Sequence, residues 1–121
     1  MATILIVDDE PITVAVVQRL LEAKGHRVLT TSSGDQAMEA VRASRPKVVL
    51  LDVNMPGKNG LAVLKEIKDY DPSVTVIMVT GSDDDATSRD ALAMGAFDYI
   101  RKPFDMGTLD KVVTWALRLI D

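Results

Sequence analysis

The sequence predicts an α/β fold in which one parallel, five-stranded sheet is covered by helices on both faces. Short apolar runs rich in valine and isoleucine recur along the 121 residues, which is typical of strands buried on both faces. Segments with a helical spacing of apolar residues separate these runs. Because right-handed crossovers place connecting helices on both faces of a parallel sheet, this order favours a three-layer, doubly wound (βα)5 sandwich. We expect residues 1–121 to form one domain.

Three apolar runs are the strongest strand candidates, and two weaker segments complete the set. The three runs are continuous or nearly so, whereas the other two alternate apolar and polar residues and suit the edges of a sheet. In chain order, the expected strands are Ile4–Val7, Arg27–Thr31, Val48–Leu51, Val74–Val79 and Phe97–Ile100.

The segments between the strands predict helices. The first helix is expected to begin at Pro11, whose fixed φ suits the first helical position, and to stop at Gly25. In the last helix, apolar residues between Leu109 and Ile120 form a single stripe. The remaining helices are expected around Gln36–Val41, Leu61–Ile67 and Ser82–Ala93, the last being the weakest.

Composition and charge exclude several classes of protein. The 14 Lys and Arg residues against 18 Asp and Glu residues give a net charge of −4, which argues against a nucleic-acid-binding surface. The absence of cysteine excludes disulfides, thiolate zinc sites and iron–sulfur clusters. No segment approaches the roughly 20 apolar residues of a membrane helix, and the N-terminus lacks the basic region of an export signal. We therefore expect a cytoplasmic protein.

Polar residues follow four of the five predicted strands. In open α/β sheets, ligands bind beyond the carboxyl ends of the strands. Asp8 and Asp9 follow the first strand, Asp52 the third, Thr80 the fourth, and Lys102 comes shortly after the fifth. We therefore expect three carboxylates, a hydroxyl and an ammonium to converge on one edge of the sheet.

These residue types suit phosphoryl transfer to a side chain. A carboxylate such as Asp52 can form an acyl phosphate, while Lys102 offers a positive charge and Thr80 a hydroxyl donor to the phosphoryl oxygens. Clustered carboxylates repel one another unless a cation lies among them. Oxygen ligands without cysteine or clustered histidine favour Mg²⁺ over Ca²⁺ or Mn²⁺.

Five landmarks occur in order along the whole chain. They are Asp8-Asp9, Asp52-Val53-Asn54-Met55-Pro56-Gly57, Thr80-Gly81, Gly95-Ala96-Phe97-Asp98-Tyr99-Ile100-Arg101 and Lys102-Pro103-Phe104. At this spacing the chain resembles the receiver domain of two-component response regulators. The resemblance implies a flavodoxin-like sheet with strand order 2-1-3-4-5, the order of the chemotaxis regulator.

The resemblance also implies a role for each site residue. Asp52 resembles the phospho-acceptor that takes a phosphoryl group from a histidine kinase or phosphotransfer protein. Asp9 resembles a direct Mg²⁺ ligand and Asp8 one acting largely through water. Asp52 and the backbone carbonyl of Asn54 complete the protein's ligands. Lys102 resembles the lysine that contacts the phosphoryl oxygen, and its bond to the following proline is commonly cis in the family.

Thr80 and Tyr99 resemble the switch pair of the family. The resemblance implies that on phosphorylation the hydroxyl of Thr80 moves to hold the phosphoryl group and the ring of Tyr99 rotates inward behind it. The face built from the fourth helix, fifth strand and fifth helix then changes its affinity for a downstream protein. The thin apolar content of Ser82–Arg89 fits a segment of low local stability. We expect a monomer or a phosphorylation-dependent dimer. We do not expect an enzyme, apart from the phosphorylation and dephosphorylation of the protein itself.

Other interpretations of the site remain open. One is a small Mg²⁺-dependent phosphohydrolase with an aspartyl-phosphate intermediate, although Asn54 stands where such enzymes carry a second, acid–base aspartate. Another is a receiver that works only as a binding module. Taken singly, Asp8 or Glu10 could simply cap the first helix.

Three further features have structural interpretations. Trp115 lies beside the stripe of the last helix, as a partly covered edge residue or as an anchor for a partner. His26 follows a glycine in a turn and is expected at the surface without a role. Asp83-Asp84-Asp85 is expected to be a solvated helix start.

Overall fold

The computed structural model describes residues 2–55, 59–81 and 85–120. Over these residues it contains one parallel sheet of five strands in the order β2-β1-β3-β4-β5, which confirms the predicted fold class and strand order. The strands are β1 (Thr3–Val7), β2 (Arg27–Thr31), β3 (Val48–Asp52), β4 (Thr75–Thr80) and β5 (Asp98–Arg101). The helices are α1 (Pro11–Ala23), α2 (Gly34–Ser44), α3 (Gly60–Tyr70), α4 (Asp85–Ala93) and α5 (Met106–Ile120).

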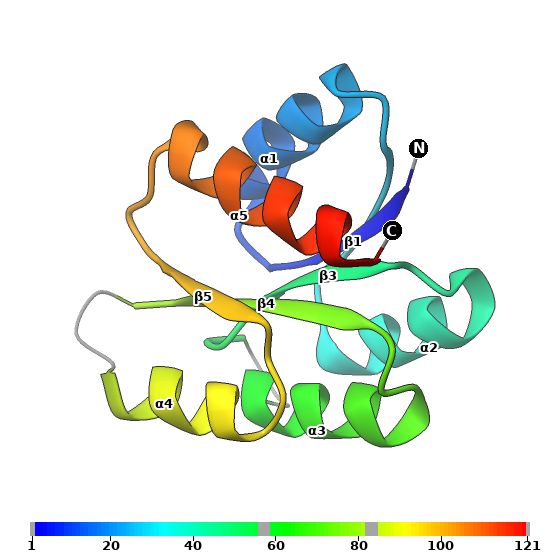
Figure 1. Ribbon diagram of the computed structural model, residues 1–121, viewed down its shortest axis with the longest axis vertical. Coiled ribbons are helices and arrows are strands. Elements are labelled where there is room, and N and C mark those ends of the chain that lie inside the picture. The colour runs from blue at the N-terminus through cyan, green and yellow to red at the C-terminus, as the bar shows by residue number, and fades with distance from the viewer. Residues whose placement is uncertain (1, 56–58, 82–84, 121) are drawn as a thin grey trace.

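The sheet is the middle of three layers (Figure 1). Helices α1 and α5 cover one face, and α2, α3 and α4 cover the other. Side chains of β1 alternate between the two faces, with Ile4 and Ile6 packed among α1 and α5 and Leu5 and Val7 facing the other helices. The weaker strands β2 and β5 form the two edges, as their alternating sequences predict.

Helix boundaries differ from the predicted ones for local reasons. Helix α2 begins two residues before the predicted segment Gln36–Val41. It begins at Gly34 because the Ser33 hydroxyl accepts a hydrogen bond from the backbone N–H of Gln36 and caps the helix. Helix α1 ends at Ala23, and Gly25 lies beyond it in a turn with a φ of 91°. The predicted start of the fourth helix at Ser82 and the acidic residues 83–84 lie outside the described residues.

The last helix buries the predicted stripe against the sheet. Leu109, Val113 and Ala116 are almost completely buried, while Trp115 beside the stripe is 50% exposed. The side chain of Ile120 lies outside the described part of the chain. No helix in the described ranges is long and apolar enough to cross a membrane.

The expected surface position of His26 is wrong. The residue is half-buried, and its enclosed Nδ1 has no hydrogen-bond partner among the described residues. Burial lowers the pKa of the imidazole, since the charged form loses hydration there. A turn position after a glycine does not reveal this burial.

Candidate functional site

The carboxyl ends of the parallel strands bring the predicted site residues to one edge of the sheet. Asp52 and Thr80 are the last residues of β3 and β4, so each strand extends one residue further than predicted. Asp8 directly follows β1, and Lys102 directly follows β5. The backbone N–H of Lys102 donates to the carbonyl of Thr80 at 2.7 Å, which fixes the lysine beside the end of β4.

Three carboxylates form a compact acidic cluster. Oxygen atoms of Asp8, Asp9 and Asp52 all lie within 4.8 Å of one another. Asp8 and Asp52 are each only 5% exposed, whereas Asp9 is exposed. Buried carboxylates need a compensating cation, and an all-oxygen ligand set suits a hard divalent ion. The residues present therefore fit a Mg²⁺ site.

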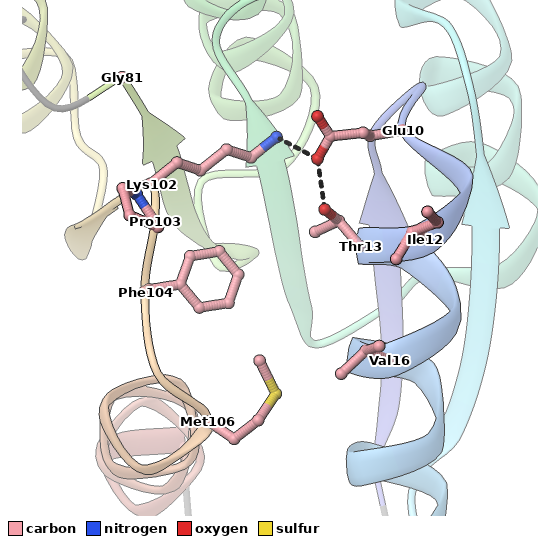
Figure 2. A pocket seen from close by; sticks show the side chains of 9 residues that line it. All are labelled: Glu10, Ile12, Thr13, Val16, Gly81, Lys102, Pro103, Phe104 and Met106. Carbon is pink, nitrogen blue, oxygen red and sulfur yellow. Dashed lines mark hydrogen bonds and ion pairs between the residues drawn. The ribbon is translucent and has the colours of Figure 1, made fainter.

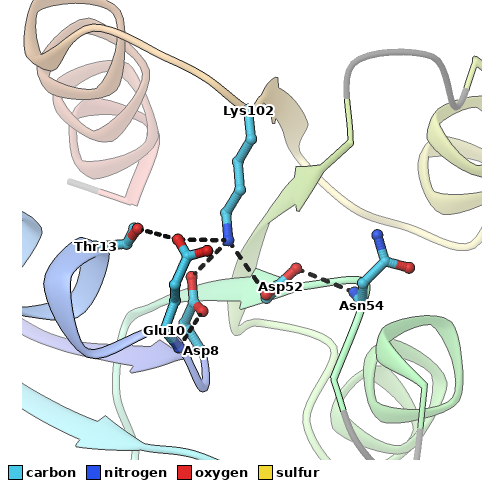
Figure 3. A network of polar contacts seen from close by, with 6 residues as sticks. All are labelled: Asp8, Glu10, Thr13, Asp52, Asn54 and Lys102. Carbon is cyan, nitrogen blue, oxygen red and sulfur yellow. Dashed lines mark hydrogen bonds and ion pairs between the residues drawn. The ribbon is translucent and has the colours of Figure 1, made fainter.

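Lys102 is the central cation of the polar network in Figure 3. Its Nζ lies 3.2 Å from Oδ2 of Asp8, 3.4 Å from Oδ2 of Asp52 and 3.7 Å from Oε1 of Glu10. Burial lowers the pKa of Lys102, but the three carboxylates together outweigh it and hold that pKa above its usual range. The side chain is therefore a fixed positive charge against the acidic cluster.

The backbone holds the two buried carboxylates in place. Oδ1 of Asp52 accepts a hydrogen bond from the N–H of Asn54 at 3.0 Å, and Oδ1 of Asp8 accepts one from the N–H of Glu10 at 3.0 Å. Each aspartate thus fixes the loop that follows it. In both residues the second oxygen faces Lys102.

The structure places Thr80 and Tyr99 on neighbouring strands. Thr80 is completely buried, and its Oγ1 has no hydrogen-bond partner within the described ranges. Tyr99 is half-buried and packs against the core on the side of α2, α3 and α4. The guanidinium of Arg101 lies 5.5 Å from the centre of its ring.

Glu10 belongs to the site although sequence reasoning considered it only as a helix cap. It occupies the N-cap position of α1, but its side chain caps no backbone N–H. The carboxylate instead accepts a hydrogen bond from the Thr13 hydroxyl and lies beside Lys102. Its place next to Asp8-Asp9 in the chain was the only signal for this role.

A groove of about 580 Å³ opens beside the lysine (Figure 2). Glu10 and Lys102 lie at its polar end, where the lysine reaches across toward the carboxylate. The remaining walls are largely apolar and come from α1 and from the segment after β5, through Ile12, Val16, Pro103, Phe104 and Met106. Ile12 is 80% exposed, so the groove presents apolar surface next to the charged site.

Comparison with known proteins identifies the family. The profile described as the response regulator receiver domain matches residues 4–114. The chain belongs to this family. Transcriptional regulatory protein ZraR of Escherichia coli (strain K12) is 40% identical over 114 residues, which are 94% of this chain and 26% of the relative. DNA-binding transcriptional regulator NtrC of Klebsiella pneumoniae is 41% identical over 101 residues, covering 84% of this chain and 22% of that protein.

Solved receiver domains have the same fold. The receiver domain of NtrX from Brucella abortus gives a TM-score of 0.91 at 37% identity, covering 95% of this chain and 98% of that chain. A response regulator receiver domain protein from Clostridium thermocellum gives 0.92 at 34% identity, covering 98% and 95%. The receiver described here spans about a quarter of the length of ZraR and NtrC. These similarities do not favour the phosphohydrolase alternative.

The loop after β5 of the receiver also follows the family pattern. The peptide bond between Lys102 and Pro103 is cis, as the resemblance implies. Residues 56–57 of the landmark after Asp52, and Ser82 after Thr80-Gly81, lie outside the described residues.

The receiver's stability in the absence of metal is expected to depend on the ionisation of Asp52. Burial, reinforced by the neighbouring Asp8, raises the pKa of Asp52 from 3.8 to about 6, against the opposing effects of the Asn54 N–H and Lys102. The folded receiver therefore binds more protons than the unfolded chain between these pH values. The free energy of unfolding in EDTA should fall, relative to Asp52→Asn, as pH rises from about 4 to about 6 and then level off. Urea titrations across this range measure the difference, and a constant difference would contradict it.

Proposed function

We propose that this receiver is a phosphorylation-controlled switch in which Asp52 accepts a phosphoryl group from a histidine kinase or phosphotransfer protein. One observation carries the proposal: Oδ2 of Asp52 lies 3.4 Å from the Lys102 ammonium within the acidic cluster, while Oδ1 is held by the Asn54 N–H. A carboxylate oxygen fixed beside a positive charge suits nucleophilic attack on phosphorus.

The transfer replaces one bond to phosphorus with another. An oxygen of Asp52 forms the new bond as the phosphorus–nitrogen bond to the donor histidine breaks. The electron pair of that bond leaves with the imidazole, which takes up a proton from water. Lys102 neutralises charge on the phosphoryl oxygens, and it already lies 3.4 Å from the acceptor.

Asp8, Asp9, Asp52 and the backbone carbonyl of Asn54 would hold Mg²⁺. When bound, Mg²⁺ supplies positive charge that offsets both the clustered carboxylates and the incoming phosphoryl oxygens. The carboxylate oxygens of Asp8, Asp9 and Asp52 lie close together, and oxygen atoms are the ligands that Mg²⁺ prefers, which supports this assignment.

Thr80 and Tyr99 form the proposed switch. The buried Oγ1 of Thr80 lacks a hydrogen-bond partner among the described residues, which leaves this hydroxyl available to a phosphoryl oxygen on Asp52. Movement of Thr80 would free space for the half-buried ring of Tyr99. The receiver then changes its affinity for a downstream protein because the two states present different surfaces.

The two partners are proposed to use different surfaces. The donor docks on the groove beside Lys102, because the exposed Ile12 and the apolar residues after β5 line this groove and the lysine in it lies 3.4 Å from Asp52. The downstream protein binds the face of α4, β5 and α5. Leu92 of α4 is 42% exposed and Trp115 of α5 is 50% exposed, so these two helices offer apolar anchors to a partner.

Phosphorylation by a small donor tests the acceptor function. Incubated with acetyl phosphate and Mg²⁺, the wild-type receiver is expected to gain the mass of a single phosphoryl group. EDTA should prevent the gain, because the clustered carboxylates then lack their cation. Intact-mass spectrometry measures both results. A folded receiver that gains no adduct from acetyl phosphate or from a phospho-histidine donor would contradict the proposal and favour a binding module.

A further inference from the structure

Glu10 has a contact that neither helix capping nor metal binding requires. Its Oε1 accepts a hydrogen bond from the Thr13 hydroxyl one helical turn further along α1. The same oxygen lies 3.7 Å from Nζ of Lys102 (Figure 3). The Thr13 hydroxyl therefore holds the carboxylate where it faces the lysine.

Glu10 differs from the other two carboxylates around Lys102 in its exposure. Asp8 and Asp52 are buried beneath the lysine, whereas the side chain of Glu10 is 59% exposed. It lies with Lys102 at the polar end of the groove (Figure 2). An exposed glutamate side chain carries a full negative charge at neutral pH.

We infer that Glu10 is a positioning residue that restrains phosphoryl acceptance. Its carboxylate, held by Thr13, competes with the incoming phosphoryl oxygens for the Lys102 ammonium and repels anionic donors at the groove. This inference rests on the proposed acceptor function of Asp52. Glu10 forms no bond to phosphorus: with acetyl phosphate, an oxygen of Asp52 bonds to phosphorus while the phosphorus–oxygen bond to acetate breaks and acetate leaves with the electron pair.

Neutralising Glu10 is expected to accelerate phosphorylation. Glu10→Gln keeps the shape and a hydrogen-bond acceptor for Thr13 but removes the charge. The rate constant with acetyl phosphate at saturating Mg²⁺ should rise about two- to five-fold, the range expected from a partly exposed ion pair. The gain should be smaller with the less highly charged phosphoramidate, and it should shrink as KCl screens the charge. Intact-mass time courses measure each rate.

Two matched variants test whether the position of the Glu10 charge, and not the net charge of the protein, changes the phosphorylation rate. Glu22→Gln makes the same charge change on the exposed surface of α1, about three helical turns away, and should leave the rate at the wild-type value. Thr13→Val keeps the Glu10 charge but removes the hydroxyl that holds it. Its rate should lie between those of the wild type and Glu10→Gln.

The possible outcomes distinguish the role of Glu10 from the proposed acceptor function of Asp52. A wild-type receiver that accepts no phosphoryl group would overturn the acceptor function itself. If the wild type is phosphorylated and Glu10→Gln reacts no faster, or if Glu22→Gln accelerates it equally, the role of Glu10 is wrong. A gain of equal size for both donors and at every salt concentration would show that charge is not the cause. Thr13→Val at the wild-type rate would exclude positioning by the threonine.

Discussion

Replacing Asp52 with asparagine is expected to abolish phosphorylation of the receiver while leaving it folded. An amide does not attack phosphorus as a carboxylate does, so no adduct should form with acetyl phosphate and Mg²⁺. The fold should persist because the new side chain has nearly the same shape, and its carbonyl oxygen can still accept the Asn54 N–H that Asp52 accepts at 3.0 Å. Intact mass measures the adduct, and far-ultraviolet circular dichroism measures the fold.

A second variant controls for the change in charge. Asp69→Asn makes the same substitution on the exposed surface of α3, where Asp69 pairs with Lys65 and is 68% exposed. This variant should be phosphorylated like the wild type. A phosphoryl adduct that persists in Asp52→Asn would show that another residue is the acceptor and would overturn the assignment of the site.

Adding a single methyl group at Gly60 is expected to destabilise the receiver and disturb the acceptor loop. A Cβ at this position would lie 2.6 Å from Cα of Val53 and 2.7 Å from the carbonyl oxygen of Asp52. Both are backbone atoms, so α3 or the end of β3 must move. The N–H of Gly60 also donates to the carbonyl of Val53 at 3.0 Å, which ties the helix to the same loop.

Overpacking of this kind costs about 1–3 kcal/mol, and we expect Gly60→Ala to lower the free energy of unfolding by that amount. The displaced backbone carries Asp52, so phosphorylation should slow as well. Urea denaturation and phosphorylation time courses measure the two effects. Gly107→Ala is the matched control, because its Cβ would meet the end of a side chain, Oδ1 of Asp105 at 3.2 Å, which needs to shift by only a few tenths of an ångström. Equal stability of Gly60→Ala and the wild type would show that the close approach carries no cost.

The order of strands and helices could be predicted from the sequence because its signals are local. The run Val48–Leu51 is apolar without interruption, and the stripe that begins at Leu109 repeats at helical spacing. The end of each strand could also be predicted to within one residue, and parallel strands bring their carboxyl ends to one edge. This reasoning was sufficient to bring Asp8, Asp52 and Lys102 together. The strand order itself came from the family resemblance, since local patterns carry no information about which strands pair.

Only the tertiary structure decided contacts between segments distant in the chain. The sequence shows Glu10 beside two aspartates, but not that its carboxylate meets a lysine contributed by the end of β5. His26 follows a glycine, but the sequence around it does not show that the residue is half-buried. The need for glycine at position 60 arises from the backbone of β3 and the loop after it. The sequence by itself thus determined the elements and the chemistry available at the sheet edge. The tertiary structure decided which groups share Lys102, because charge and packing act through distances that no local pattern contains.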